Sequence, residues 1–207
     1  LAPLALEHLV SQRGQQGRVV ATTASSARTR LQAERLGCSY TMVPVGAASL
    51  HREFGEGDVL LAHDEQGGIS LPGYLHKRDA LVLAVMLVEL CAGTPETLSE
   101  HMQALEDHLG VMEYGARDVR LDFAAMQRLR NLLPGANPHS VLGNEPTQVS
   151  HADGLRMEFA DGSWLLVRPS RVRQVARCVA EAPTRELRDA LLDLACEVAR
   201  DPYAFEN

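Results

Sequence analysis

Short apolar runs alternate with amphipathic stretches along the first half of the chain. The runs 18–23, 40–45 and 59–62 are rich in β-branched and aliphatic residues, which is typical of buried strands. Helical periodicity follows the first two runs, and the almost wholly apolar segment 80–92 predicts a helix buried against a sheet. Because alternating strands and helices form βαβ units, this half predicts an α/β domain with a parallel sheet.

Helix start and stop signals refine this prediction. Leu4 to Val10 form a helical face after Pro3, and we expect residues 1–16 to be the closing helix of a preceding domain. Thr97 and Glu100 have the spacing of a capping box, so a further helix is expected to begin there and to end before Gly110.

The pattern changes after Gly110, where we expect a hinge at 111–114. The next stretch mixes short strands, a hairpin turn at 160–163 and two helices, which predicts a small α+β domain of the order β-α-β-β-β-α. The expected strands are 119–121, 155–159, 164–167 and 175–180, and the expected helices are 123–133 and 184–200.

Composition excludes several classes of function. The 207 residues are 45% hydrophobic and 23% charged, with a formal net charge of −7. An acidic average argues against nucleic acid as a partner, because phosphate backbones require clustered positive charge. No apolar run reaches the roughly 18 to 20 residues of a membrane span, and the first residues lack the basic region of a signal peptide. We therefore expect a cytoplasmic protein without a membrane partner.

No metal site or catalytic residue is predicted from spacing. The four cysteines are far apart and are expected to be buried free thiols. His101 and His108 share a helix face without a third ligand, so a surface position is the simpler interpretation. Ser25 and Ser26 lack a neighbouring base, and helix capping is their expected role.

A first candidate site follows the apolar run 59–62. Asp64 and Gln66 offer hydrogen-bond acceptors, while Gly67 and Gly68 allow the backbone to approach a ligand closely. Ligands of open parallel sheets bind at the carboxyl ends of strands. Because the acceptors in this segment suit hydroxyl groups, a polyol is the expected ligand. The alternative is that this polar, glycine-rich segment is an ordinary solvated turn.

A second candidate site follows the strand that ends near Val167. Arg168 and Ser170 combine a guanidinium, a hydroxyl and the amides of a turn, which suits an anion such as phosphate. Arg171 and Arg173 add positive charge to the same loop. The alternative is a solvated basic turn without a ligand.

Together these segments resemble the α-D-phosphohexomutases, the family of the phosphoglucomutases and phosphomannomutases. The resemblance rests on the segments 64–69, 76–79, 153–156, 161–170 and 181–182. It implies the carboxyl-terminal half of such an enzyme, an isomerase that interconverts hexose 1- and 6-phosphates. The implied fold is a three-layer α/β/α domain with a mixed, mostly parallel sheet at 1–112, followed by a smaller α+β domain at 113–207.

The resemblance also implies roles for individual residues, and some residues differ from the family motifs. It implies that Asp64, Gln66, Gly67, Gly68 and Gly46 bind the hexose. The sugar loop of the family usually reads Gly-Glu-Glu-Ser-Gly-Gly, so Asp64 stands for a glutamate and Gln66 for a serine. The family motif Pro-Val-Gly-Phe-Lys continues after Gly46 here with two alanines, so the active-site lysine is missing.

The phosphate loop departs from its family pattern as well. The resemblance assigns Arg168, Ser170, Arg171 and Arg173 to the phosphate, but the usual Arg-Pro-Ser-Gly-Thr-Glu-Pro keeps only its first three residues here. The family's phosphorylated serine and its magnesium-binding aspartates have no counterpart in these residues. We therefore expect magnesium and the catalytic serine on the amino-terminal domains of the same enzyme. The alternative is a non-catalytic phosphosugar-binding or regulatory relative.

Overall fold

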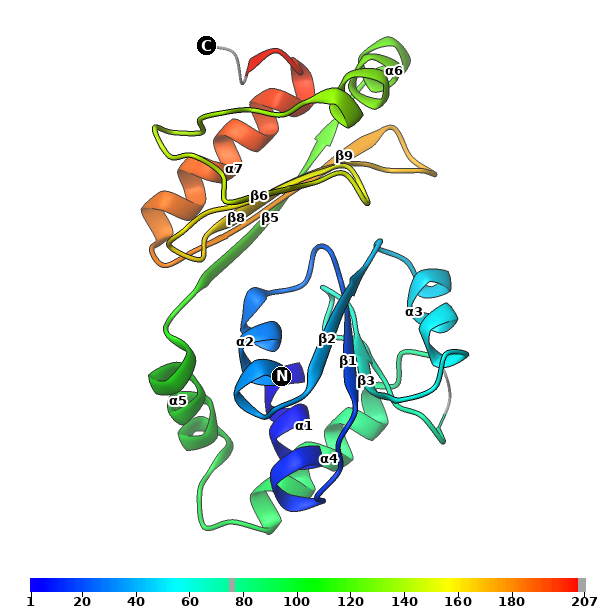
Figure 1. Cartoon of the computed structure of the whole chain (residues 1–207), viewed down its shortest axis with the longest axis vertical. Helices are drawn as coiled ribbons and strands as arrows, with labels where there is room; N and C mark the ends of the chain where they lie inside the picture. Colours follow the sequence, from blue (N-terminus) through cyan, green and yellow to red (C-terminus); the bar gives the residue numbers. More distant parts are fainter. Residues whose placement is uncertain (75–76, 205–207) are drawn as a thin grey trace. The chain divides into compact units, whose positions relative to one another are not determined.

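A computed structural model of the chain describes residues 1–74 and 77–204. The chain divides into two compact units, Leu1–Val111 and Met112–Asn207 (Figure 1). Within the described ranges, no helix combines the length and apolarity that crossing a membrane requires. Each unit has its own sheet and its own hydrophobic core.

The first unit is built on a four-stranded sheet of the order β2-β1-β3-β4. β1 (Arg18–Thr22) pairs in parallel with β2 (Ser39–Val43) and β3 (Val59–His63), and the short β4 (Ile69–Ser70) runs antiparallel to β3. β4 is antiparallel because the loop 64–68 is far too short for the crossover that a parallel connection needs. The mixed, mostly parallel sheet confirms the expected fold class.

Helices cover both faces of this sheet and complete three layers (Figure 1). On one face, Leu50 of α3 (Ala47–Phe54) packs against the sheet. On the other face, α1 (Ala2–Glu7) and α4 (Ala80–Ala92) share a core with Leu61 of β3. The remaining helical segments of this unit are α2 (Ala27–Arg35), α5 (Leu98–Leu109) and a π-helical continuation of α1 (His8–Gln12).

Side-chain caps fix where several helices begin. Ser26 and Asp79 accept backbone N–H bonds of 3.0 to 3.2 Å from the first turns of α2 and α4. Thr97 and Glu100 form the predicted capping box, in which the Thr97 N–H donates to the Glu100 carboxylate at 2.7 Å. The capping role expected of Ser26 is therefore confirmed, and each cap satisfies amides that a helix start leaves without partners.

The burial expected for α4 is only partly correct. Leu83 and Met86 are buried, but Leu81, Val85 and Val88 are 79%, 63% and 69% exposed. The sequence is apolar around the whole helix, so its pattern could not show that only one face packs within the unit.

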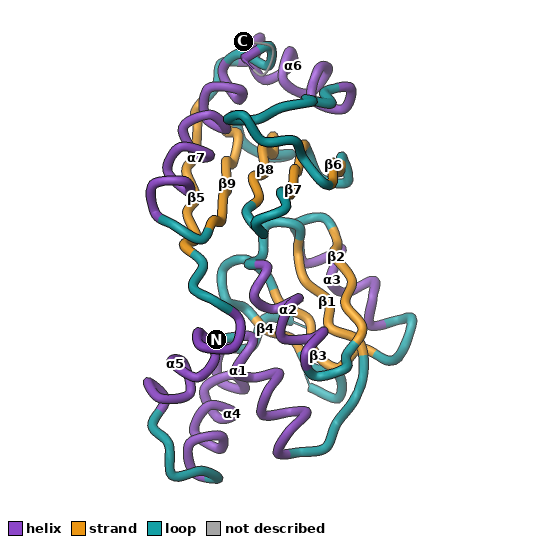
Figure 2. The backbone as a smooth tube through the Cα atoms, turned by 60° about the vertical axis from the view of Figure 1, so that its left-hand side comes forward, coloured by secondary structure: helices purple, strands orange, loops and turns teal. Residues whose placement is uncertain are grey.

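The second unit is a five-stranded antiparallel sheet of the order β5-β9-β8-β7-β6, which Figure 2 shows strand by strand. Its helices α6 (Phe123–Leu132) and α7 (Arg185–Arg200) lie on the same face of the sheet (Figure 1). Their apolar side chains form one core with the strands. The strands are β5 (Glu113–Arg120), β6 (Gln148–Ser150), β7 (Leu155–Glu158), β8 (Trp164–Pro169) and β9 (Val175–Ala182).

Two of these strands differ from the sequence prediction. β5 begins at Glu113, well before the expected start at Val119, so Glu113 and Tyr114 of the expected hinge segment are strand residues. Its sequence has few β-branched residues, yet every residue pairs with β9. β6 was not predicted, because three residues that pair only with β7 carry little local signal. Tertiary pairing overrides local propensity in both cases.

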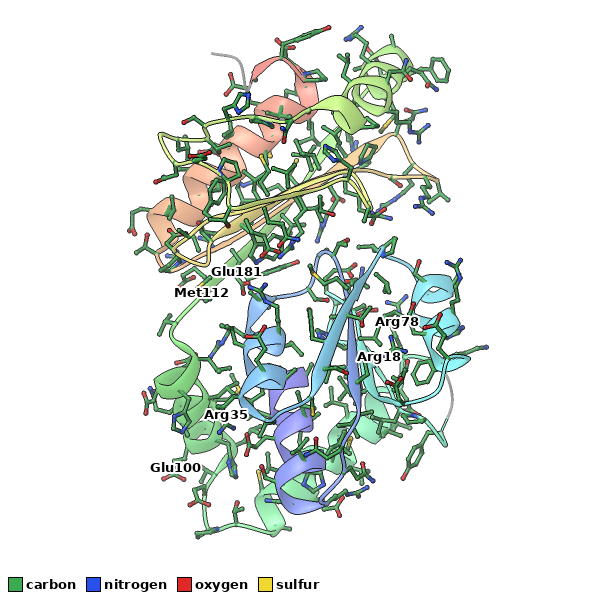
Figure 3. All side chains as sticks on the ribbon, in the orientation of Figure 1. Arg18, Arg35, Arg78, Glu100, Met112 and Glu181 are labelled. Carbon is green, nitrogen blue, oxygen red and sulfur yellow. The ribbon has the colours of Figure 1, made fainter. Side chains whose placement is uncertain are left out.

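Charged and aromatic side chains meet on the sheet face opposite α6 and α7. The guanidinium of Arg156 lies 3.8 Å from the ring centroid of Trp164. The Trp164 indole donates its Nε1–H to Glu181 at 2.8 Å, and Arg156 Nε donates to Glu158 at 3.0 Å. Arg156, Trp164 and Glu181 are each at most 4% exposed (Glu181 is labelled in Figure 3), so these contacts stabilise charges removed from water.

The four cysteines are free thiols, and the burial expected of all four is found for three. Cys38, Cys178 and Cys196 are buried, while Cys91 is half-buried. Burial raises the pKa of the Cys178 thiol, so this side chain is a neutral core residue at physiological pH.

Candidate functional site

The loop 64–68 is held together by the carboxylate of Asp64. Its Oδ1 accepts the backbone N–H groups of Gln66 at 2.9 Å and Gly68 at 3.0 Å, and the Asp64 N–H donates to the Gly68 carbonyl at 3.0 Å. Gly67 has a φ of 82°, a conformation that favours glycine. The loop is therefore a preformed tight turn at the carboxyl end of β3.

Arg78 closes the other side of this loop. Its Nη1 lies 3.1 Å from Asp64 Oδ2 and donates to Gln66 Oε1 at 3.3 Å. The aliphatic part of Arg78 crosses Gly68 so closely that a Cβ on Gly68 would overlap it. A side chain at position 68 would therefore displace Arg78 from this position. His76, from the same sequence motif, lies outside the described residues.

A hydroxyl at the end of β1 also contacts the loop. Thr22 Oγ1 donates to Glu65 Oε2 at 2.9 Å and lies 3.0 Å from Ser25 Oγ. β1 and β3 are parallel neighbours, so their carboxyl ends meet at one edge of the sheet. The polar residues that follow β1 and β3 in the sequence therefore lie close together at this edge.

His63 precedes the loop as the last residue of β3. The imidazole is 4% exposed, and its Nδ1 lies 3.3 Å from the carbonyl oxygen of Asp64. Burial lowers the pKa of His63 to about 4, outweighing the opposite effect of the Asp64 carbonyl. A neutral ring that donates Nδ1–H to this carbonyl fits the geometry at pH 7.

The second loop turns between β8 and β9. The Ser170 N–H donates to the Val175 carbonyl at 2.8 Å, and Ser170 Oγ accepts the N–H groups of Val172 at 3.3 Å and Arg173 at 3.1 Å. Arg130 of α6 donates from Nη2 to the Ser170 carbonyl at 2.6 Å. The serine hydroxyl therefore shapes the turn, and a fourth arginine lies beside the three of the loop.

A buried carboxylate orients the arginine that begins this loop. Arg168 donates from Nε to Asp153 Oδ2 at 2.6 Å, and Arg171 Nη2 lies 3.6 Å from Asp153 Oδ1. Asp153 is 8% exposed, whereas the Arg171 side chain is 71% exposed. The terminal nitrogens of Arg168 make no hydrogen bond within the residues described. They present a planar pair of donors, as bidentate phosphate binding requires.

Gly154 makes this ion pair possible. It has a φ of 107°, and an added Cβ would overlap the Val167 carbonyl and lie 3.0 Å from Arg168 Cα. Only a residue without a side chain allows the two backbones to come this close. The close approach brings Asp153 alongside Arg168.

The structure groups most of the predicted binding residues. Arg78 and the turn itself link Asp64, Gln66 and Gly68, and Asp153 links Arg168 with Arg171. By contrast, Gly46 is the N-cap residue of α3. A Cβ atom added to Gly46 would have no neighbouring heavy atom within 4 Å. Within the described residues, Arg173 contributes its backbone amide to the turn and forms no ion pair.

Asp153, Arg78 and Arg130 were not among the predicted site residues. Asp153 and Arg78 lie in segments that carried the family resemblance, so that signal could have identified them. Arg130 contacts Ser170 from a separate helix, and no local sequence pattern predicts such a contact. In the ranges 1–74 and 77–204, no group of three or more His, Cys, Asp or Glu side chains could hold a metal ion.

Comparison with known proteins assigns this architecture to a class of sugar phosphomutase domains. The family model for the phosphoglucomutase/phosphomannomutase α/β/α domain III matches residues 1–108. The chain therefore belongs to the phosphoglucomutase/phosphomannomutase family, and the resemblance seen in its sequence motifs is confirmed.

Individual relatives share most of this chain. A phosphoglucomutase/phosphomannomutase of Thermococcus kodakarensis is 24% identical over 185 residues, which is 89% of this chain and 38% of that protein. A Thermus thermophilus structure assigned as a phosphomannomutase has a TM-score of 0.73 and 28% identity, covering 96% of this chain and 39% of its own. An Aspergillus fumigatus N-acetylphosphoglucosamine mutase, solved with GlcNAc-6P and magnesium, has a TM-score of 0.62 and 16% identity over 97% of this chain and 43% of its own. The chain thus spans less than half the length of these relatives.

The ion pair between the buried Asp153 and the partly buried Arg168 can be tested by substitution. Asp153→Asn removes the charge that the Arg168 guanidinium faces, and we expect the free energy of unfolding to fall by about 2 kcal/mol. The control is Asp118→Asn in the same sheet, whose 2.9 Å pair with Arg177 is exposed and should cost no more than about 0.5 kcal/mol. Urea denaturation measures both, and equal losses would contradict a special role for Asp153.

Proposed function

We propose that this chain is the carboxyl-terminal portion of a phosphohexomutase, an isomerase that interconverts hexose 1- and 6-phosphates. In this proposal the portion supplies binding: the loop 64–68 and Gly46 bind sugar hydroxyls, and the loop 168–173 binds phosphate. The observation that carries the proposal is the Arg168 guanidinium, which Asp153 holds through Nε while its terminal nitrogens stay available. Membership of the phosphoglucomutase/phosphomannomutase family supports the reaction class.

In this proposal the catalytic groups belong to the amino-terminal domains of the same enzyme. The relatives are more than twice as long as this chain, which leaves room for such domains. The Aspergillus protein was solved with GlcNAc-6P and magnesium, which supports a hexose phosphate as ligand and magnesium as cofactor of the complete enzyme. Bound magnesium would stabilise charge on the transferred phosphoryl group.

The geometry of Asp64 favours a second candidate function, a non-catalytic phosphosugar-binding relative. Both carboxylate oxygens already have protein partners, two amides on Oδ1 and Arg78 on Oδ2. Alanine stands at position 48, where the resembling family has its active-site lysine. A binding protein needs neither that lysine nor turnover, so measuring mutase activity of the complete protein separates the two candidates.

A first test concerns activity of the chain by itself. Because the serine and magnesium loops of the family have no counterpart in these residues, we expect no conversion of glucose 1-phosphate to glucose 6-phosphate, even with a sugar bisphosphate activator. A coupled assay for glucose 6-phosphate measures this. Turnover by the pure chain would show that the catalytic groups lie within it.

A second test compares two residues of the sugar loop. Gln66→Ala removes an exposed amide and should weaken glucose 6-phosphate binding to the complete protein by about 1 kcal/mol at unchanged stability. Asp64→Ala also removes the acceptor that organises the loop, so both affinity and melting temperature should fall. Titration calorimetry and thermal denaturation provide the two readouts. If neither variant changed the affinity, the loop would be an ordinary turn.

A third test compares two arginines of the phosphate loop. Arg168→Ala should abolish the phosphate-dependent shifts of amide resonances from 167 to 174. Arg171→Ala should weaken binding by no more than about 1 kcal/mol, because that side chain is 71% exposed. Arg185→Ala, an exposed charge at the start of α7, serves as the control. A larger loss from Arg171→Ala than from Arg168→Ala would mean that the loop binds anions by another geometry.

A further inference from the structure

A small cavity lies beside the loop 64–68 within the first unit. Its volume is about 270 Å³, slightly below the usual range for small-ligand sites. Arg78, labelled in Figure 3, lines this cavity and also contacts Asp64 of the loop 64–68. The lining residues are Ala47, Leu50, His51, Ser70, Lys77 and Arg78.

A buried hydroxyl faces this cavity. Ile69 of β4 packs into the core that contains α1 and α4, and successive strand residues point to opposite faces. Ser70 therefore points to the face covered by α3, where the cavity lies. It is 4% exposed, and its hydroxyl makes no hydrogen bond within the described residues. A buried hydroxyl without a protein partner is a ready donor or acceptor for a ligand.

The other polar groups of the wall favour an anion. Lys77 and Arg78 are cations, and none of the described residues that line the cavity is a carboxylate. Arg78 already contacts Asp64, whereas Lys77 forms no ion pair with any described residue. The helix α3 begins at this wall without a side-chain cap or an acidic residue in its first turn, so its positive end is not neutralised locally.

We propose that this cavity is an anion subsite, distinct from the loop 168–173, which takes a phosphate group of a sugar phosphate whose hydroxyls lie at the loop 64–68. Lys77 supplies the charge, Ser70 a hydrogen bond, and Arg78 connects the subsite to the loop. This inference rests on the proposed sugar-binding function. The small side chain of Ala47 provides the space, and a phenylalanine at this position would fill much of the cavity. The first unit then recognises both the hydroxyls and the phosphate of its ligand.

Lys77 is the only lysine in the chain, which makes the proposal directly measurable. Reductive methylation with ¹³C-formaldehyde of the whole chain labels Lys77 and the terminal amine, whose NMR signals are distinct. We expect inorganic phosphate to shift the Lys77 signal saturably, while sodium chloride at equal ionic strength does not. Glucose 6-phosphate should shift the same signal at lower concentration than phosphate, because the loop 64–68 adds contacts.

Three variants test whether phosphate binds in the cavity itself. Ala47→Phe should abolish the saturable Lys77 shift, and Lys77→Gln should weaken phosphate binding about tenfold at the amides of Ala47 and Ser70. Arg52→Gln removes a charge from the same helix outside the cavity wall, and binding should be retained.

Two results would overturn the subsite. One is a Lys77 signal that phosphate does not shift saturably, and the other is an unchanged response in Ala47→Phe. In either case, glucose 6-phosphate binding that still depends on Gln66 and Arg168 would leave the proposed function standing. A Lys77 response to phosphate that glucose 6-phosphate fails to reproduce would also overturn the sugar-phosphate subsite.

Discussion

Buried carboxylates need partners, and this requirement shapes both candidate binding loops. Asp64 and Asp153 are each 8% exposed. An unpaired charge at that depth costs several kcal/mol, so each position is tolerable only with a cation and further donors nearby. Asp64 meets the requirement with two loop amides and Arg78, and Asp153 meets it with Arg168. The same interactions that satisfy the carboxylates hold the loops in shape.

This arrangement changes what each side chain can do for a ligand. A carboxylate that organises a loop has less capacity to accept further hydrogen bonds. If the loop 64–68 binds a sugar as proposed, exposed groups such as Gln66 would supply more of the contacts. An arginine anchored through Nε loses rotamer freedom before any phosphate arrives, which lowers the entropic cost of binding. The loop 64–68 is therefore rigid but has fewer free acceptors, while the loop 168–173 has a preorganised pair of donors.

Local patterns in the sequence predicted much of the fold. The apolar runs located β1, β2 and β3, and the Thr97 and Glu100 spacing located the start of α5. These features could be predicted because strand burial and helix capping depend on residues close together in the chain. The long β5 and the three-residue β6 depend instead on partner strands distant in sequence, and no window around them carries that information.

The same distinction applies to the candidate sites. Glycines, carboxylates and arginines at strand ends identified the loops 64–68 and 168–173. The partners that set their geometry come from elsewhere: Arg78 from the start of α4, Asp153 from before β7 and Arg130 from α6. The local sequence thus located the candidate loops, but only the fold determined which atoms of each side chain remained free.

The apolar outer face of α4 has a consequence for how stability experiments on this chain are interpreted. Leu81, Val85 and Val88 are already largely hydrated in the folded state, so unfolding exposes little additional surface at these positions. The denaturant m-value and the heat-capacity change scale with newly exposed area. They therefore report on the inner face of α4, where Leu83 and Met86 are buried, and are nearly insensitive to the outer face.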